Sequence, residues 1–145
     1  MTTIQGMVRK GSGTASRNLD TQLPLIAREF PEIVECHRGT INLELDNPVV
    51  VVSPDHRTNR IDWDPHHAPG EVFDLVRVCL EAPLGAAAVP GWLYVAHHSD
   101  HRRNLRMHEV IAEKVSVTEG TRCAIHLNRE CVTLPYRNFP VVVII

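Results

Sequence analysis

The chain has 145 residues, of which 43% are hydrophobic and 22% charged, and its formal net charge at pH 7 is -2. A chain of this length forms one domain, here residues 1–145, and buries about two-thirds of the surface that its unfolded form exposes. The near-neutral charge gives no sign of an electrostatic partner such as bulk nucleic acid or an anionic membrane, and we expect neither. The apolar tail from Val141 to Ile145 is far shorter than the roughly 20 residues of a membrane-spanning helix.

The four cysteines lie singly, without a C-x-x-C pair, and no charged segment followed by an apolar one opens the chain. Scattered cysteines are typical of a reducing compartment, where disulfides are rare. We therefore expect a cytoplasmic protein. Cys79 and Cys123 lie in apolar runs, where a thiol packs as a small hydrophobe.

Short segments rich in β-branched residues and bounded by turn-forming residues predict a mainly β domain. In chain order, the expected strands are Thr2 to Arg9, Thr40 to Leu45, Val49 to Ser53, Val72 to Leu80, Trp92 to Ala96, Arg122 to Leu127 and Val141 to Ile145. The Asp-Asn-Pro turn that ends at Pro48 predicts that the second and third of these strands form a hairpin.

One helix is expected from Thr21 to Phe30, capped by Asp20 or Thr21 and with Pro24 in its first turn. Around Asn104 to Lys114, apolar residues recur at helical spacing, but a strand is an equal alternative. Residues 55–70 are polar and rich in turn-forming residues, which predicts a long surface loop.

A run of glycines and small residues directly follows the first expected strand. Its members are Gly11, Ser12, Gly13, Thr14, Ala15 and Ser16, flanked by Lys10 and Arg17. Glycines let the backbone approach a ligand closely, and N–H and hydroxyl groups can donate to phosphate oxygens. The run matches neither the Walker pattern nor a full G-x-G-x-x-G, so a flexible hairpin loop is the alternative to a phosphate cradle.

Alternation along the expected strand from Thr40 to Leu45 places Thr40, Asn42 and Glu44 on one face. Thr40 and Asn42 offer two neutral oxygens about 7 Å apart along the strand. Such a pair is a poor cage for a bare cation but suffices for Mg²⁺ already held by nucleotide phosphates. The alternative is an ordinary half-buried strand with one face in solvent.

The glycine run, the expected helix and the segment Gly39 to Leu45 (GTINLEL), in this order and at this separation, resemble the archaeal-type CTP-dependent riboflavin kinases. The likeness continues at Glu109 to Ala112 (EVIA), similar to that family's E-I-I-A, and at Val117 to Thr121, similar to its L-x-D-G-D turn. It spans roughly Ile4 to Leu127, so residues 130–145 form a C-terminal extension.

The resemblance implies a closed or partly open cradle-loop β-barrel with one or two short helices. Such a protein transfers the γ-phosphate of CTP to the 5′-hydroxyl of riboflavin and gives FMN and CDP. The run from Gly11 to Ser16 would bind the nucleotide, Thr40 and Asn42 would hold Mg²⁺, and Glu109 would contact the flavin end. His98 and His101 would lie on the substrate side. The acceptor of the hydroxyl proton stays open between His97, His98, Asp100 and Glu109.

Two departures from the family fall on the parts that set specificity. The P-x-x-L-R segment that follows E-I-I-A in the family has no counterpart, because Glu113 to Ser116 stands there. His101 occupies the position of a family threonine eight residues before Glu109. A different nucleotide or a related small-molecule hydroxyl is therefore an alternative, and so is a non-catalytic regulatory barrel that binds a nucleotide or flavin.

Three further groupings carry weaker alternatives. The histidines around His97 to His101 could ligate a transition metal, although no spacing matches H-E-x-x-H or a zinc finger. The basic cluster from Arg102 to Arg106 could contact phosphates, but aromatics make up only 5% of the chain and give little surface for base stacking. Asp62 and Asp64 are interpreted as part of a solvated turn rather than an acid-base pair.

Overall fold

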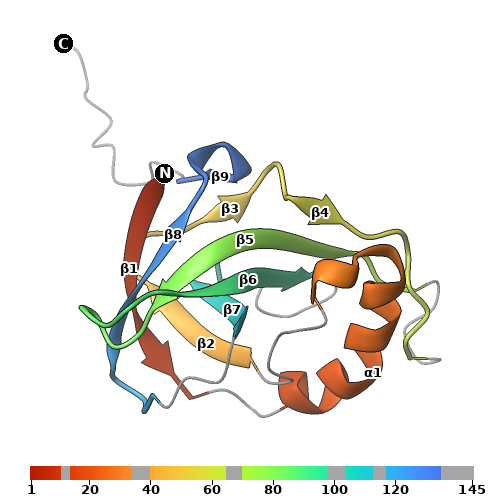
Figure 1. Cartoon of the computed structure of the whole chain (residues 1–145), viewed down its shortest axis with the longest axis horizontal. Helices are drawn as coiled ribbons and strands as arrows, with labels where there is room; N and C mark the ends of the chain where they lie inside the picture. Colours follow the sequence, from red (N-terminus) through yellow and green to blue (C-terminus); the bar gives the residue numbers. More distant parts are fainter. Residues whose placement is uncertain (11–13, 34–39, 65–69, 98–103, 113–116, 135–145) are drawn as a thin grey trace.

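A computed structural model describes residues 1–10, 14–33, 40–64, 70–97, 104–112 and 117–134 (Figure 1). The elements are β1 (Thr2–Arg9), α1 (Thr14–Glu29), η1 (Pro31–Ile33), β2 (Thr40–Leu45), β3 (Val50–Val51), β4 (His56–Arg57), β5 (Phe73–Glu81), β6 (Val89–Ala96), β7 (Met107–Ala112), β8 (Arg122–Leu127), η3 (Arg129–Cys131) and β9 (Val132–Thr133). Within these ranges, no helix is both long and apolar enough to cross a membrane.

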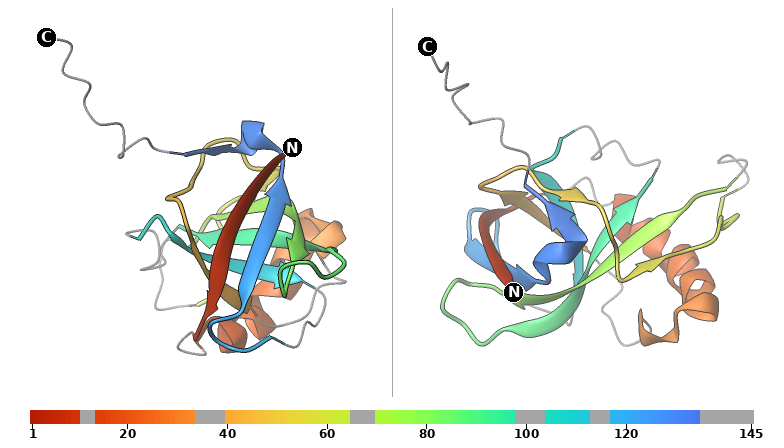
Figure 2. Two further views of the ribbon diagram at one scale, coloured as in Figure 1. Left: turned by 90° about the vertical axis from the view of Figure 1, so that its left-hand side faces the viewer. Right: turned by 90° about the horizontal axis from the view of Figure 1, so that it is seen from above.

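Six antiparallel strands close into a barrel in the order β5-β6-β7-β2-β1-β8, and β8 pairs again with β5. In the view from above, the strands curl into a ring and α1 lies to one side of it (Figure 2). The short strand β4 extends the sheet beyond β5, and β3 pairs with β9 in a separate small sheet. The expectation of a mainly β protein built on a single closed barrel with few helices is confirmed.

The barrel has two apolar layers because side chains alternate along each strand. The inner layer fills the barrel and includes Leu43, Val76, Leu93, Val110 and Ile125, all fully buried. The outer layer lies between α1 and the outer faces of the sheet. It joins Leu19, Leu23 and Ile26 of α1 to Phe73 and Leu75 of β5, Trp92 and Tyr94 of β6 and Ile111 of β7. The helix is thereby fixed over β5, β6 and β7.

Helix α1 begins seven residues before the predicted start, at Thr14 rather than Thr21, and Pro24 lies in its interior rather than in its first turn. The apolar residues Leu19, Leu23 and Ile26 share one face at helical spacing and are buried against the barrel. Burial of this stripe outweighs the cost of about 3 kcal/mol that an interior proline imposes. The prediction of the first turn was therefore wrong.

The predicted hairpin between β2 and β3 is also wrong. Strand β2 pairs with β1 on one edge and β7 on the other, whereas β3 pairs with β9. After Pro48 the chain leaves the barrel wall, and the Val49 N–H donates to the Leu105 carbonyl at 2.8 Å. This crossing carries β3 over the end of the barrel instead of along β2.

The structure assigns secondary structure within two segments, residues 104–114 and 55–70. The stretch around Asn104 to Lys114 contains the strand β7, so the helical alternative is wrong there. The predicted loop 55–70 contains β4 and an isolated bridge between Ile61 and Glu71, so part of it extends the sheet. The expected strand Val141 to Ile145 lies outside the described residues.

Candidate functional site

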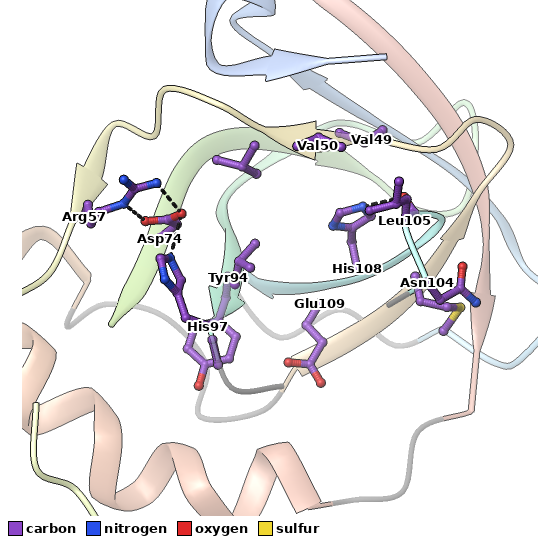
Figure 3. Close-up of a pocket in the computed structure, with 14 residues that line it drawn as sticks. Val49, Val50, Arg57, Asp74, Tyr94, His97, Asn104, Leu105, His108 and Glu109 are labelled. Carbon is purple, nitrogen blue, oxygen red and sulfur yellow. Dashed lines mark hydrogen bonds and ion pairs between the residues drawn. The ribbon is translucent and has the colours of Figure 1, made fainter. Parts of the chain in front are cut away.

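A pocket opens where β6 and β7 diverge (Figure 3). The two strands pair from Gly91 opposite Ala112 to Tyr94 opposite Glu109. Beyond that point β6 continues along β5, while the first residues of β7 lie along β2. The resulting gap holds a cavity of about 170 Å³.

The cavity has an apolar side and a polar side. Val49, Val50 and Val51 cross over it, and the rest of the apolar wall consists of Val95, Ala96, Leu105 and Met107. The polar lining consists of Arg57, Asp74, Tyr94, His97, Asn104, His108 and Glu109. Small-molecule sites combine apolar walls with convergent polar groups, and this pocket has both.

Asp74 is the centre of an ion-paired cluster within the polar lining. Its carboxylate accepts hydrogen bonds from Arg57 Nε at 2.6 Å and Nη2 at 3.0 Å, and His97 Nε2 lies 3.0 Å from Oδ2. Only 5% of the Asp74 side chain is exposed. Burial by itself raises the pKa of Asp74, but the hydrogen bonds and charges of Arg57 and His97 outweigh it and hold this pKa below its usual value. Asp74 is therefore ionised at neutral pH.

The lowered pKa of Asp74 predicts a specific pH dependence of stability. An aspartate that has a lower pKa in the folded state stabilises the fold above its unfolded pKa of about 3.9, and this contribution is lost as the pH falls through the folded value. We expect the free energy of unfolding to fall more steeply in the wild type than in Asp74→Asn below about pH 4. Urea titrations at a series of pH values measure this difference, and equal slopes would contradict it.

Glu109 lies on the opposite face of β7 from the barrel interior, with 8% of its surface exposed. Its cross-strand neighbours are Tyr94 on β6 and Asn42 on β2. The Tyr94 hydroxyl donates to Gln22 Oε1 of α1. Burial, followed by the negative charges of Glu109 and Glu71, raises the pKa of Tyr94 far above its usual value. Tyr94 therefore stays a neutral hydrogen-bond donor that ties α1 to the edge of the pocket.

Asn42, the cross-strand neighbour of Glu109 on β2, carries an unsatisfied oxygen. Its Oδ1 is buried and has no hydrogen-bond partner among the described residues. A buried acceptor without a donor costs about 1–3 kcal/mol, which a bound donor or cation would recover. The amide oxygen of Asn42 is an oxygen donor of the kind that Mg²⁺ prefers, and Thr40 adds a hydroxyl two residues along the same face. These residues fit a magnesium ion that takes its other ligands from phosphates and water.

No protein family model matches the chain, and no curated protein does either. The ligands of the pocket are therefore inferred from its chemistry and from the motifs in the sequence. Among the described residues, no three His, Cys, Asp or Glu side chains gather as a metal site. His98 and His101, the remaining predicted substrate residues, lie outside the part of the chain that the structure describes.

The predicted nucleotide-binding run divides into two parts. Gly11, Ser12 and Gly13 lie outside the described residues. Thr14, Ala15 and Ser16 form the first turn of α1 rather than the loop that their small side chains suggested. The reason is that the helix extends back from the buried stripe at Leu19, and the backbone N–H groups of its first turn have no partners within the helix. The run therefore leads directly into a helix N-terminus.

Sequence reasoning missed the pairing of Arg57 with Asp74, although the signal is present. Asp74 stands in the otherwise apolar run from Val72 to Val76, and a charged residue there requires a partner if the run is a buried strand. Arg57 is its cross-strand neighbour on β4, a strand that was expected to be loop. His97 was a candidate proton acceptor, and it lies in the pocket.

Proposed function

We propose that the chain is a Mg²⁺-dependent small-molecule phosphotransferase of the CTP-dependent riboflavin kinase type. It would transfer the γ-phosphate of CTP to the 5′-hydroxyl of riboflavin or of a related small molecule. The observation that carries the proposal is the placement of Asn42 directly opposite Glu109 on neighbouring strands. The sequence resemblance assigns these residues to the metal and to the acceptor, which must lie close together for transfer to occur.

Two further features support this proposal. The closed barrel is the architecture that the resemblance implies. In addition, α1 begins at Thr14, immediately after the glycine run, so the N–H groups of its first turn can bind phosphate oxygens in the way that helix N-termini bind anions.

Phosphoryl transfer requires positioning and charge neutralisation more than covalent participation by the protein. A bound Mg²⁺ would neutralise the phosphate oxygens, and Thr40 and Asn42 are the residues that would hold it. Glu109, fixed between β6 and β2, would orient the acceptor from its place in the pocket wall. The valines that cross the cavity would exclude water from the acceptor.

A second candidate function is a non-catalytic barrel that binds a nucleotide or flavin. The observation that favours it is the size of the cavity, which at about 170 Å³ lies below the roughly 300–1,000 Å³ of pockets for drug-sized ligands. A cavity of about 150 Å³ accommodates a single benzene ring. The part of the pocket lined by described residues thus has room for one ring of a single ligand, such as a nucleotide base, rather than for two substrates held side by side.

Thermal melting with ligands tests the proposed function. We expect CTP with Mg²⁺ to raise the melting temperature more than ATP, GTP or UTP does, and riboflavin to add to the effect. A ligand at 100 times its Kd adds about 2.7 kcal/mol, which is several degrees for a domain of this size. Stabilisation by riboflavin or a nucleotide without any turnover would favour the second candidate. No shift with any nucleotide would contradict the proposal.

A further inference from the structure

His97 occupies a fixed position at the edge of the pocket. It directly follows the last residue of β6, and its backbone N–H donates to the Val72 carbonyl at 3.0 Å. Its side chain is 26% exposed, lines the cavity, and reaches Asp74 Oδ2 through Nε2 (Figure 3). Backbone and side chain are therefore both held to the β5 side of the pocket.

The contact with Asp74 determines how this imidazole can act. An ionised carboxylate only accepts hydrogen bonds, so Nε2 must carry the proton that it donates to Oδ2. In a neutral ring of this tautomer, the lone pair that accepts a proton lies on Nδ1. The arrangement of a carboxylate that orients a histidine base is the one used in hydroxyl activation by catalytic triads.

The charged groups around His97 favour this role over the other candidates. Arg57 on β4 holds Asp74 ionised, and Glu109 and His108 face the cavity from β7. His108 Nε2 lies 2.9 Å from the Leu105 carbonyl, a backbone oxygen. Near neutral pH, an imidazole is a better proton acceptor than a carboxylate such as Glu109. His97 is thus the best placed base among the described pocket residues.

We infer that His97, oriented by Asp74, accepts the proton of the acceptor hydroxyl in this pocket, an inference that rests on the proposed function. The acceptor oxygen forms a bond to the γ-phosphorus, and its proton moves to Nδ1 of His97. The bond from the γ-phosphorus to its bridging oxygen breaks, and the electron pair leaves on CDP. The imidazolium is stabilised by Asp74 and returns its proton to solvent.

The test compares FMN formation from Mg²⁺, CTP and riboflavin by the wild type, His97→Gln and Asp74→Asn from about pH 5.5 to about pH 9. We expect His97→Gln to lower kcat by about 10²–10⁴-fold with an unchanged riboflavin KM. The fall in rate on the acidic side of the wild-type profile should disappear in this variant. Asp74→Asn should also lower kcat. If His97→Gln does not fold, the kcat of Asp74→Asn tests the role of His97 instead.

His126→Gln is a matched control. His126 Nε2 lies 3.1 Å from Glu81 Oε1, and its side chain is 26% exposed like that of His97, but it does not line the pocket. We expect wild-type kcat in this variant. A wild type that forms FMN while folded His97→Gln keeps its rate and pH profile would overturn the role of His97 and leave the kinase intact. A wild type that forms no FMN at any pH would overturn the kinase, and the role of His97 with it.

Discussion

Replacing Asn42 with alanine is expected to lower Mg²⁺-dependent turnover by about 100-fold or more with little loss of stability. The activity falls because the variant loses an oxygen that the proposed metal site uses. The loss of stability should be small because Asn42 Oδ1 is a buried acceptor with no partner among the described residues, so the loss of this oxygen breaks no hydrogen bond within them. FMN formation at a series of Mg²⁺ concentrations and thermal melting of the same samples measure the two effects. Thr40→Ala should also lower Mg²⁺-dependent turnover.

Glu44→Ala provides the control for these variants. Glu44 lies on the same strand and face as Asn42, but it is 39% exposed and pairs with Arg9 Nε at 2.9 Å. We expect its loss to leave turnover near the wild-type rate. Unchanged turnover in both Thr40→Ala and Asn42→Ala would contradict the proposal that these two residues hold Mg²⁺.

The largest effect on stability is expected for Phe73→Ala. Phe73 is fully buried in the layer between α1 and the sheet, and its ring stacks against Tyr94 with centroids 5.5 Å apart. Loss of this ring removes apolar burial and leaves a cavity, which costs about 3–5 kcal/mol. Urea denaturation measures the change. Because Phe73 directly precedes Asp74, we also expect the variant to weaken the ion-paired cluster of the pocket.

Leu84→Ala tests whether burial is the cause. Leu84 is 42% exposed in the turn between β5 and β6, so its truncation should change the free energy of unfolding by less than about 0.5 kcal/mol. A loss below about 1 kcal/mol in Phe73→Ala would show that α1 does not depend on this layer.

The strands could be predicted where the local pattern is sufficient. β1, β2 and β8 begin and end at the predicted residues because β-branched residues fill them and turn-forming residues or glycine bound them. Which strands are neighbours could not be predicted in the same way. Pairing of β2 with β7 joins residues far apart in the chain, and no local turn signal specifies it. The hairpin prediction failed for this reason.

In the candidate site, too, single residues could be predicted from the sequence, but their contacts with distant residues could not. Glu109 was a predicted substrate residue and lines the pocket, and Asn42 was a predicted metal ligand and lies opposite it. The cluster of Arg57, Asp74 and His97 brings together three separate segments, and only the register of β4, β5 and β6 places them in contact. A charged residue in an apolar strand indicates that a partner exists, but the sequence does not say which residue it is.

Transfer of the γ-phosphate itself tests the central proposal most directly. Purified protein is incubated with Mg²⁺, riboflavin and CTP labelled in its γ-phosphate, and the products are separated. We predict labelled FMN together with CDP, and its absence when Mg²⁺ is chelated or riboflavin is omitted. If the label stays in CTP while the folded protein binds both ligands, the barrel is a binding module and the kinase assignment is wrong.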